Sequence, residues 1–195
     1  MITKDQLVFS QIAEEVATVI NKSQLFQELL DNNKFLVRQA EQLKEVANCD
    51  ALTGGLNRGA FMVTLARQIR ASAAVGKTLG VIMADIDHLK EVNDTNGHAA
   101  GDLALREFTH RLSSALRQND YLGRYGGEEF LILIDDTNAD ALPKIAERFR
   151  SIITASLGLA VVTDAAKSAQ AVVAVADGAL YAAKGGGRNR CVLAG

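Results

Sequence analysis

The stretch Arg124–Phe130, RYGGEEF, places two glycines and two adjacent glutamates between segments that otherwise resemble buried strands. Glutamates are almost never fully buried without a partner. Glu128 and Glu129 are therefore expected to be solvated, paired with a cation or bound to a metal. The glycine pair before them is a hairpin signal, so both carboxylates are predicted to lie at a tight turn between two strands.

A second pair of carboxylates follows the apolar run Leu79–Ala84. Asp85 and Asp87 are two residues apart, a spacing that sends both side chains to the same side of a sheet. If Asp85 lies near the acidic hairpin, a divalent cation would relieve their repulsion, and oxygen ligands of this kind favour Mg²⁺. The alternative is that Asp85 and Asp87 only cap the following helix, but the acidic hairpin favours the metal site.

The segment after this strand, KEVNDTNGHAAGDLAL, is rich in groups that can bind a polar ligand. Its Asn, Asp and Gly residues predict a structured loop between helices. Asp102 can accept two hydrogen bonds from the edge of a guanine base. The alternative for Asp102 is a helix N-cap, and His98 alone is more typical of a structural residue.

Two cations near the C-terminus, Lys184 and Arg188, flank the glycines of AAKGGGRNR. Flexible backbone with flanking cations can hold phosphate oxygens. The pattern is weak alone, because Lys and Gly also end ordinary helices.

Helices and strands alternate from Asp50 onward and must position these residues. Helices are predicted over 57–72, 99–116, 139–150 and 168–184, and strands over 79–84, 121–134 (two strands), 152–162 and 190–193. This order predicts a single α/β or α+β domain.

The first 49 residues contain no Gly or Pro and have a helical composition. Spacings of four and three alternate along Leu25, Leu29, Asn32, Leu36, Gln39, Leu43 and Val46. This pattern predicts the seam of a short coiled coil, in which Asn32 and Gln39 would fix register and pairing. The alternative is one amphipathic helix packed on its own domain.

The composition is that of a soluble globular chain: 195 residues, 48% hydrophobic, with a net charge of −2. No Lys/Arg block is present, which disfavours a nucleic-acid binder. Cys49 and Cys191 are isolated, which fits a reducing, cytoplasmic compartment. There is no apolar run long enough to cross a membrane and no signal-peptide core, so no membrane segment is expected in this chain.

Five segments resemble, in order, the motifs of the GGDEF domain of bacterial diguanylate cyclases. They are DALTGGLNRGAF, DIDHLKEVNDTNGHAAGD, RYGGEEF, SLGLA and ADGALYAAKGGGRN, and they cover nearly all of residues 50–190. The resemblance implies a fold like the palm of nucleotidyl cyclases, with a mainly antiparallel sheet flanked by helices. It divides the chain into a signalling helix or coiled coil, 1–49, and a GGDEF domain, 50–195. The first thirty residues resemble the closing helix of a GAF-type sensory domain.

The activity implied by this resemblance is the condensation of two GTP into cyclic di-GMP and two pyrophosphates, with Mg²⁺ as cofactor and Mn²⁺ as an alternative. Because one domain binds one GTP, the reaction implies a homodimer, formed through the N-terminal helix. Product feedback inhibition is also implied. The alternative function is an inactive GGDEF domain that serves as a receptor for GTP or cyclic di-GMP. A third is a cyclase that uses other nucleotides.

The resemblance also assigns roles to individual residues. It implies metal ligation by Asp85, Glu128 and the backbone carbonyl of Ile86; catalysis by Glu128 as proton acceptor with Glu129 and Lys90; substrate binding by Asn93, His98, Asp102, Gly126, Gly127, Lys184 and Arg188; and an inhibitory product site at Arg117, Asp120 and Arg148. The alternative for Arg117 and Asp120 is an ordinary surface ion pair, which contributes little.

The departures from the family pattern lie outside the predicted metal ligands. Leu89 stands where Phe is usual, an apolar exchange. Gly55 and Gly59 replace a larger apolar residue and a second Arg, which loosens the start of the helix that follows. After Arg150 the family usually inserts a loop or hairpin, whereas here a short connection is predicted.

Overall fold

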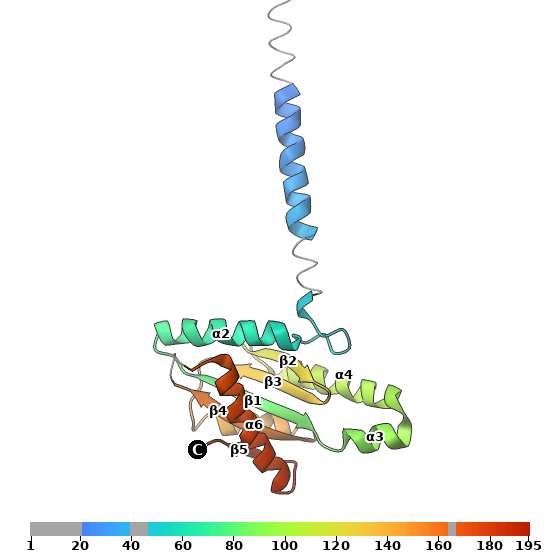
Figure 1. Cartoon of the computed structure of the whole chain (residues 1–195), viewed down its shortest axis with the longest axis vertical. Helices are drawn as coiled ribbons and strands as arrows, with labels where there is room; N and C mark the ends of the chain where they lie inside the picture. Colours follow the sequence, from blue (N-terminus) through green and yellow to red (C-terminus); the bar gives the residue numbers. More distant parts are fainter. Residues whose placement is uncertain (1–20, 40–46, 164–166) are drawn as a thin grey trace, which may run out of the picture. The chain divides into compact units, whose positions relative to one another are not determined.

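The computed structural model describes residues 21–39, 47–163 and 167–195, and the chain divides into two units, Met1–Ala47 and Asn48–Gly195. In the first unit, residues 21–39 form a helix (Figure 1). Leu25, Leu29 and Leu36 of the predicted seam are exposed on it. Leu43 and Val46, and most of the segment that resembles the end of a sensory domain, lie outside the described residues. None of the described helices is long and apolar enough to cross a membrane.

The second unit is a five-stranded sheet with helices on both faces. Its elements are α2 (Arg58–Ala74), β1 (Leu79–Ile86), α3 (Leu89–Asn96), α4 (His98–Ala115), β2 (Tyr121–Gly126), β3 (Glu129–Ile134), α5 (Leu142–Arg150), β4 (Ala155–Val162), α6 (Ala169–Gly185) and β5 (Cys191–Leu193). The strand order is β2-β3-β1-β4-β5, and only the β4–β5 pair is parallel. The predicted mainly antiparallel sheet flanked by helices is therefore confirmed.

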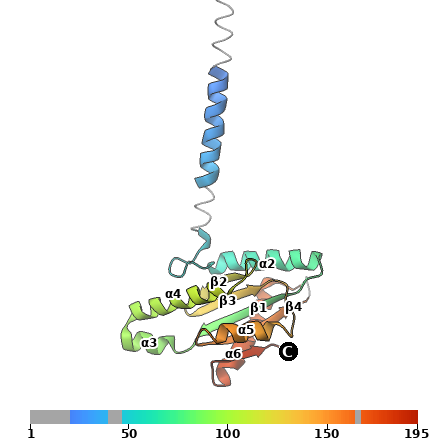
Figure 2. The ribbon, with the colours of Figure 1, turned by 180° about the vertical axis from the view of Figure 1, so that it is seen from behind.

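The central strand β1 is buried along its whole length and supplies both halves of the core. Ile82 and Ala84 face the cluster formed with α4 and α5, whereas Val81 and Met83 face the cluster formed with α2 and α6. Figure 1 shows α2 and α6 on one side of the sheet, and Figure 2, seen from behind, shows α4 and α5 on the other. A continuous apolar run is what a strand covered on both faces requires.

One predicted element is wrong: residues 89–96 form the helix α3, not a loop. Leu89 is buried at its start, and α3 packs against α4, so tertiary contact outweighs the turn preference of the Asn and Asp residues. Gly97, with φ of 82°, is the break between the two helices. The predicted strand from 152 begins only at Ala155, after a turn that joins α5 to β4 by a short path.

Helix α6 lies directly on β4 because of Gly158. A Cβ atom at this position would overlap the backbone oxygen of Ala176 and the backbone nitrogen of Leu180. Any larger residue would push the helix away from the sheet. The close approach fixes where the last turn of α6, with Lys184, lies relative to the end of β1.

We predict that Gly158→Ala lowers the free energy of unfolding by about 2 kcal/mol, because the added methyl group overpacks the contact between β4 and α6. Gly178→Ala on α6 is the matched control, since nothing lies within 4 Å of a Cβ atom there. Removing a helical glycine should raise the free energy of unfolding by roughly 0.5–1 kcal/mol. Urea unfolding of both variants measures the difference, and equal effects would contradict this account of the contact.

Candidate active site

Asp85 and Asp87 lie at the end of β1 and are buried, with exposed fractions of 3% and 8%. Both carboxylates face the α6 side of the sheet, because Asp85 contacts Lys184 and Asp87 contacts the backbone of Asn189. Across the sheet, Asp85 is paired with Glu129 on β3. The end of β1 therefore brings acids from two strands together beneath the last turn of α6.

Asp87 holds the chain in place. Its Oδ1 accepts a hydrogen bond of 2.8 Å from the hydroxyl of Ser156, and its Oδ2 accepts one of 2.9 Å from the backbone N–H of Asn189. Both oxygens are engaged by protein groups. Asp87 thus ties the segment after α6 to the sheet, a role that the sequence did not reveal.

Asp85 has a cation as its partner instead. The ammonium Nζ of Lys184 lies 2.7 Å from its Oδ2. Burial raises the pKa of the Asp85 carboxyl, and the charge of Asp87 acts in the same direction. Lys184 and, more weakly, Arg188 oppose this shift. The predicted phosphate-binding cations therefore lie within electrostatic reach of the predicted metal ligand.

The hairpin turn consists of Gly127 and Glu128, because Gly126 pairs with Glu129 across the strands. Gly127 has φ of 55°, a backbone conformation that favours glycine. Nothing lies within 4 Å of a Cβ atom built on Gly126 or Gly127, so the space above the turn is open. The carbonyl of Glu128 accepts a hydrogen bond of 3.3 Å from the N–H of Ile86, which ties the turn to β1.

The donor set at the end of β1 fits a hard divalent cation. Burial and the charge of Asp85 raise the pKa of both Glu128 and Glu129, so these carboxyls repel one another in a partly desolvated site. A bound cation would remove this repulsion. Among the described residues, no group of three or more His, Cys, Asp or Glu side chains is arranged as a metal site. The two predicted carboxylate ligands would therefore be completed by carbonyl, water or ligand oxygens, as Mg²⁺ prefers.

Arg124 is a positioning residue that the sequence analysis missed. Its Nε and Nη2 donate hydrogen bonds of 2.9 and 2.7 Å to the carbonyl of Gly127, and its Nη1 lies 3.3 Å from Oδ1 of Asp50. Asp50 in turn accepts from the N–H and hydroxyl of Thr53. The start of the domain is thus linked to the turn that carries Glu128. A carbonyl at a tight turn needs a hydrogen-bond donor, and Arg124, three residues before Gly127, is a nearby side chain that can supply one.

The predicted guanine-binding residues lie on α3 and α4. Asn93 packs against Gly101, where a Cβ atom would overlap its side chain. His98 and Asp102 are exposed and one turn apart on α4. Because α4 begins at His98, Asp102 is not an N-cap, and that alternative is wrong. Lys90 is exposed on α3.

The predicted product-binding residues surround the end of α4. The carboxylate of Asp120 accepts from the backbone N–H of Arg117 at 2.9 Å and of Asp135 at 3.1 Å. Arg148 on α5 donates to the carbonyl of Ala115 at 3.0 Å. Within the described residues, Arg117 and Asp120 form no ion pair between their side chains, so the surface ion-pair alternative does not hold.

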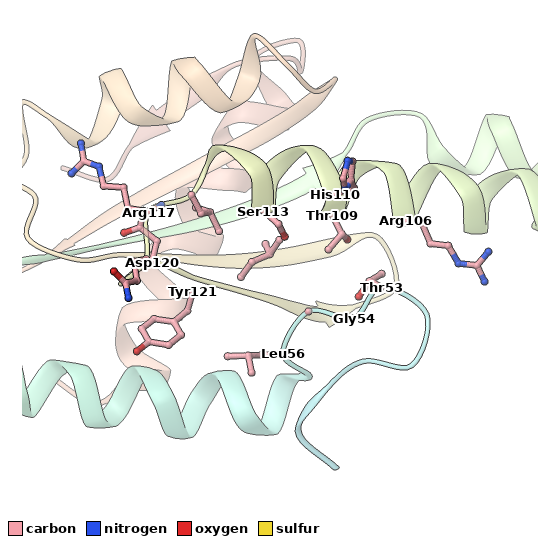
Figure 3. A pocket seen from close by; sticks show the side chains of 14 residues that line it. Thr53, Gly54, Leu56, Arg106, Thr109, His110, Ser113, Arg117, Asp120 and Tyr121 are labelled. Carbon is pink, nitrogen blue, oxygen red and sulfur yellow. The ribbon is translucent and has the colours of Figure 1, made fainter. Parts of the chain in front are cut away.

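A pocket of about 610 Å³ lies between α4, β2 and the loop before α2. Figure 3 shows Arg117 and Asp120 at one end of it and Thr53 and Arg106 at the other. Gly54 and Gly55 line the pocket, and Gly55 is the position where the family pattern has a larger apolar residue. The sequence pattern predicts neither the pocket nor its lining by Arg106.

Residues 47–190 match the family model described as "Diguanylate cyclase, GGDEF domain". Diguanylate cyclase A of Treponema denticola is 36% identical over 169 residues, which cover 78% of this chain and 46% of that protein. The chain thus spans less than half of this relative.

Two solved structures resemble the chain over nearly its whole length. The coiled coil and GGDEF domain of DgcB from Caulobacter crescentus, in complex with c-di-GMP, is 29% identical with a TM-score of 0.77, and the match covers 96% of this chain and 99% of that one. Diguanylate cyclase SiaD from Pseudomonas aeruginosa, in complex with its activator SiaC, is 30% identical with a TM-score of 0.76, over 97% and 78%.

We predict that Arg124→Met lowers the free energy of unfolding by roughly 1–3 kcal/mol, because the carbonyl of Gly127 loses its donor and the carboxylate of Asp50 loses its ion-pair partner. Amide hydrogen exchange at residues 126–129 should accelerate as well. Arg106→Met is the control, since Arg106 is exposed and its hydrogen bond to the carbonyl of Leu52 is long at 3.4 Å. Unchanged exchange at the turn in Arg124→Met would show that the guanidinium does not hold it.

Proposed function

The chain belongs to the GGDEF family, and from that premise we propose that it is a diguanylate cyclase, which condenses two GTP into cyclic di-GMP and two pyrophosphates. One observation carries the proposal. Asp85 at the end of β1 lies within electrostatic reach of Glu128, whose turn is open on its outer side and is held by Ile86. These acidic donors and the open turn support the proposal that a metal-bound triphosphate binds here.

Asp85, Glu128 and the carbonyl of Ile86 are proposed to hold Mg²⁺, or Mn²⁺ in its place. When bound, the cation supplies charge neutralisation and lowers the pKa of a coordinated hydroxyl. Glu129 lies opposite Asp85 across the sheet and adds negative charge to the same site.

The remaining groups orient the two reactants. Asn93, His98 and Asp102 are proposed to bind the guanine and ribose, which places the nucleotide along α3 and α4. Lys90, Lys184 and Arg188 are proposed to bind the triphosphate, with the turn at Gly126 and Gly127 beneath it. Glu128 accepts the proton of the 3′-hydroxyl as that oxygen attacks the α-phosphorus of the second GTP, and pyrophosphate leaves in line.

Two GGDEF domains must face one another, since each is proposed to bind one of the two GTP molecules. We propose that the N-terminal helix forms a coiled coil and brings two copies of the chain together. Its exposed Leu25, Leu29 and Leu36 support this, as does the likeness to a structure that contains a coiled coil and a GGDEF domain. The coiled coil would raise the effective concentration of one GTP-binding domain for the other.

We also propose feedback inhibition by cyclic di-GMP at Arg117, Asp120 and Arg148. The guanidinium of Arg117 has no ion-pair partner among the described residues and lines a pocket large enough for part of a dinucleotide. Because Asp120 holds two backbone N–H groups, it also shapes the loop that presents Arg117. The c-di-GMP complex of the DgcB domain supports a product-binding role for this family.

A receptor that binds GTP or cyclic di-GMP without turnover is the alternative function. Pyrophosphate release from GTP with Mg²⁺, at protein concentrations that favour dimers, separates the two functions. A protein that binds the nucleotide and releases no pyrophosphate would support the receptor.

We predict that Glu128→Gln reduces turnover at least about a hundredfold, because the amide is a poor metal ligand and cannot accept the proton. The fold should persist, since Glu128 lies at a turn and its structural hydrogen bond uses the backbone carbonyl. Pyrophosphate release and circular dichroism measure both effects. A folded variant with full activity would contradict the assignment.

We predict that Arg117→Ala weakens inhibition by cyclic di-GMP at least about tenfold and leaves the initial rate similar, because an exposed guanidinium that recognises the product is lost. Its backbone N–H still bonds to Asp120, so the loop should remain in place. Initial rates at rising product concentration test this. An unchanged inhibition constant would show that Arg117 does not bind the product.

A further inference from the structure

The ion pair between Lys184 and Asp85 occupies one oxygen, Oδ2, of the carboxylate that the proposed metal requires. Asp85 is 3% exposed. Among the described residues, the charged group within hydrogen-bond distance of its carboxylate is the ammonium of Lys184, which lies 2.7 Å from Oδ2. A buried carboxylate needs a cation or hydrogen-bond donors to remain ionised. Lys184 supplies that positive charge.

Two constraints hold the base of Lys184 near Asp85. Gly158 lets α6 lie directly on β4, one strand from Asp85. After α6, the N–H of Asn189 donates a hydrogen bond to Asp87, so the chain that follows Lys184 is tied to the end of β1. The backbone before and after Lys184 is therefore held, which fixes where its side chain begins.

The side chain of Lys184 is only partly enclosed. The Lys184 side chain is 32% exposed, and its charge acts on Glu128 in the hairpin turn. Lysine carries a compact charge on a flexible stem of four carbons. It can exchange Asp85 for a nearby phosphate oxygen without movement of α6.

A metal and the ammonium cannot share Asp85 at low cost. A divalent cation bound about 2.1 Å from Oδ2 of Asp85, the oxygen that is paired with Lys184, would lie roughly 4 Å from Nζ in its present position. Like charges at that distance repel strongly in a partly buried site. A triphosphate changes the balance, because its oxygens offer Lys184 a new anion and the metal additional ligands.

We propose that Lys184 is an internal counter-ion that keeps divalent metal off Asp85 until nucleotide phosphate draws the ammonium away. Metal and nucleotide then bind with positive coupling, and the empty site does not collect metal. This inference rests on the proposed function, since it assumes that Asp85 is a metal ligand and that a triphosphate binds beside it.

Mn²⁺ binding to the full chain, followed by the electron paramagnetic resonance signal of free Mn²⁺, tests the proposal without activity. In the absence of nucleotide, Lys184→Met should bind Mn²⁺ at least about tenfold more tightly than the unchanged chain, because the competing charge is gone. Lys184→Gln should do the same, whereas Lys184→Arg, which keeps the charge, should bind weakly. Lys144→Met on α5 removes an exposed lysine elsewhere and should change nothing.

A second measurement adds a non-hydrolysable GTP analogue. The unchanged chain should gain Mn²⁺ affinity with the analogue, and Lys184→Met should gain less, because its metal site is already accessible. Adding Glu128→Gln to Lys184→Met should abolish the tight binding, which places the metal at this site. If that tight binding persists, the metal lies elsewhere and the inference is wrong.

Two outcomes separate this inference from the proposed function. If Lys184→Met and Lys184→Gln bind Mn²⁺ no more tightly than the unchanged chain, while the analogue still promotes metal binding, the counter-ion role is wrong and the metal–nucleotide site stands. If the unchanged chain shows no coupling between the analogue and Mn²⁺, the proposed site itself fails and the inference fails with it.

Discussion

A buried acid at the end of the central strand is the constraint on which the site depends. Asp85 is almost fully enclosed, and the acids of the neighbouring hairpin add repulsion to the cost of its burial. Lys184 on α6 offsets this negative charge, and the contact of α6 with Gly158 on β4 positions it. The same imbalance of negative charge makes the end of β1 suited to a divalent cation and to the phosphates that accompany it.

Other charged groups near Asp85 hold the backbone in place. Asp87, like Asp85, is a buried carboxylate, but both of its oxygens bind protein groups and hold the chain after α6. Arg124 bonds to the carbonyl of Gly127 and to Asp50. The turn that carries Glu128 is therefore held from the edge of the sheet and from the start of the domain. Such support would keep the carboxylate that we propose to be catalytic in place at the hairpin turn.

The sequence predicted much of this arrangement because its signals were local. The apolar run before Asp85 and the glycines before Glu128 marked the strand and the hairpin, and both exist. Residues 89–96 were mistaken for a loop, because turn-forming side chains on an exposed helix surface look the same as a loop in sequence. The roles of Arg124 and Gly158 depend on which backbone atoms lie beside them after folding, and no local pattern carries that information.

The most direct test of the account is a crystal structure of the chain with Mn²⁺ and a non-hydrolysable GTP analogue, in which anomalous scattering locates the metal. The account predicts a peak about 2.2 Å from carboxylate oxygens of both Asp85 and Glu128, with the Lys184 ammonium moved onto a phosphate oxygen. A bound analogue with no metal between these two carboxylates, and Lys184 still paired with Asp85, would contradict it.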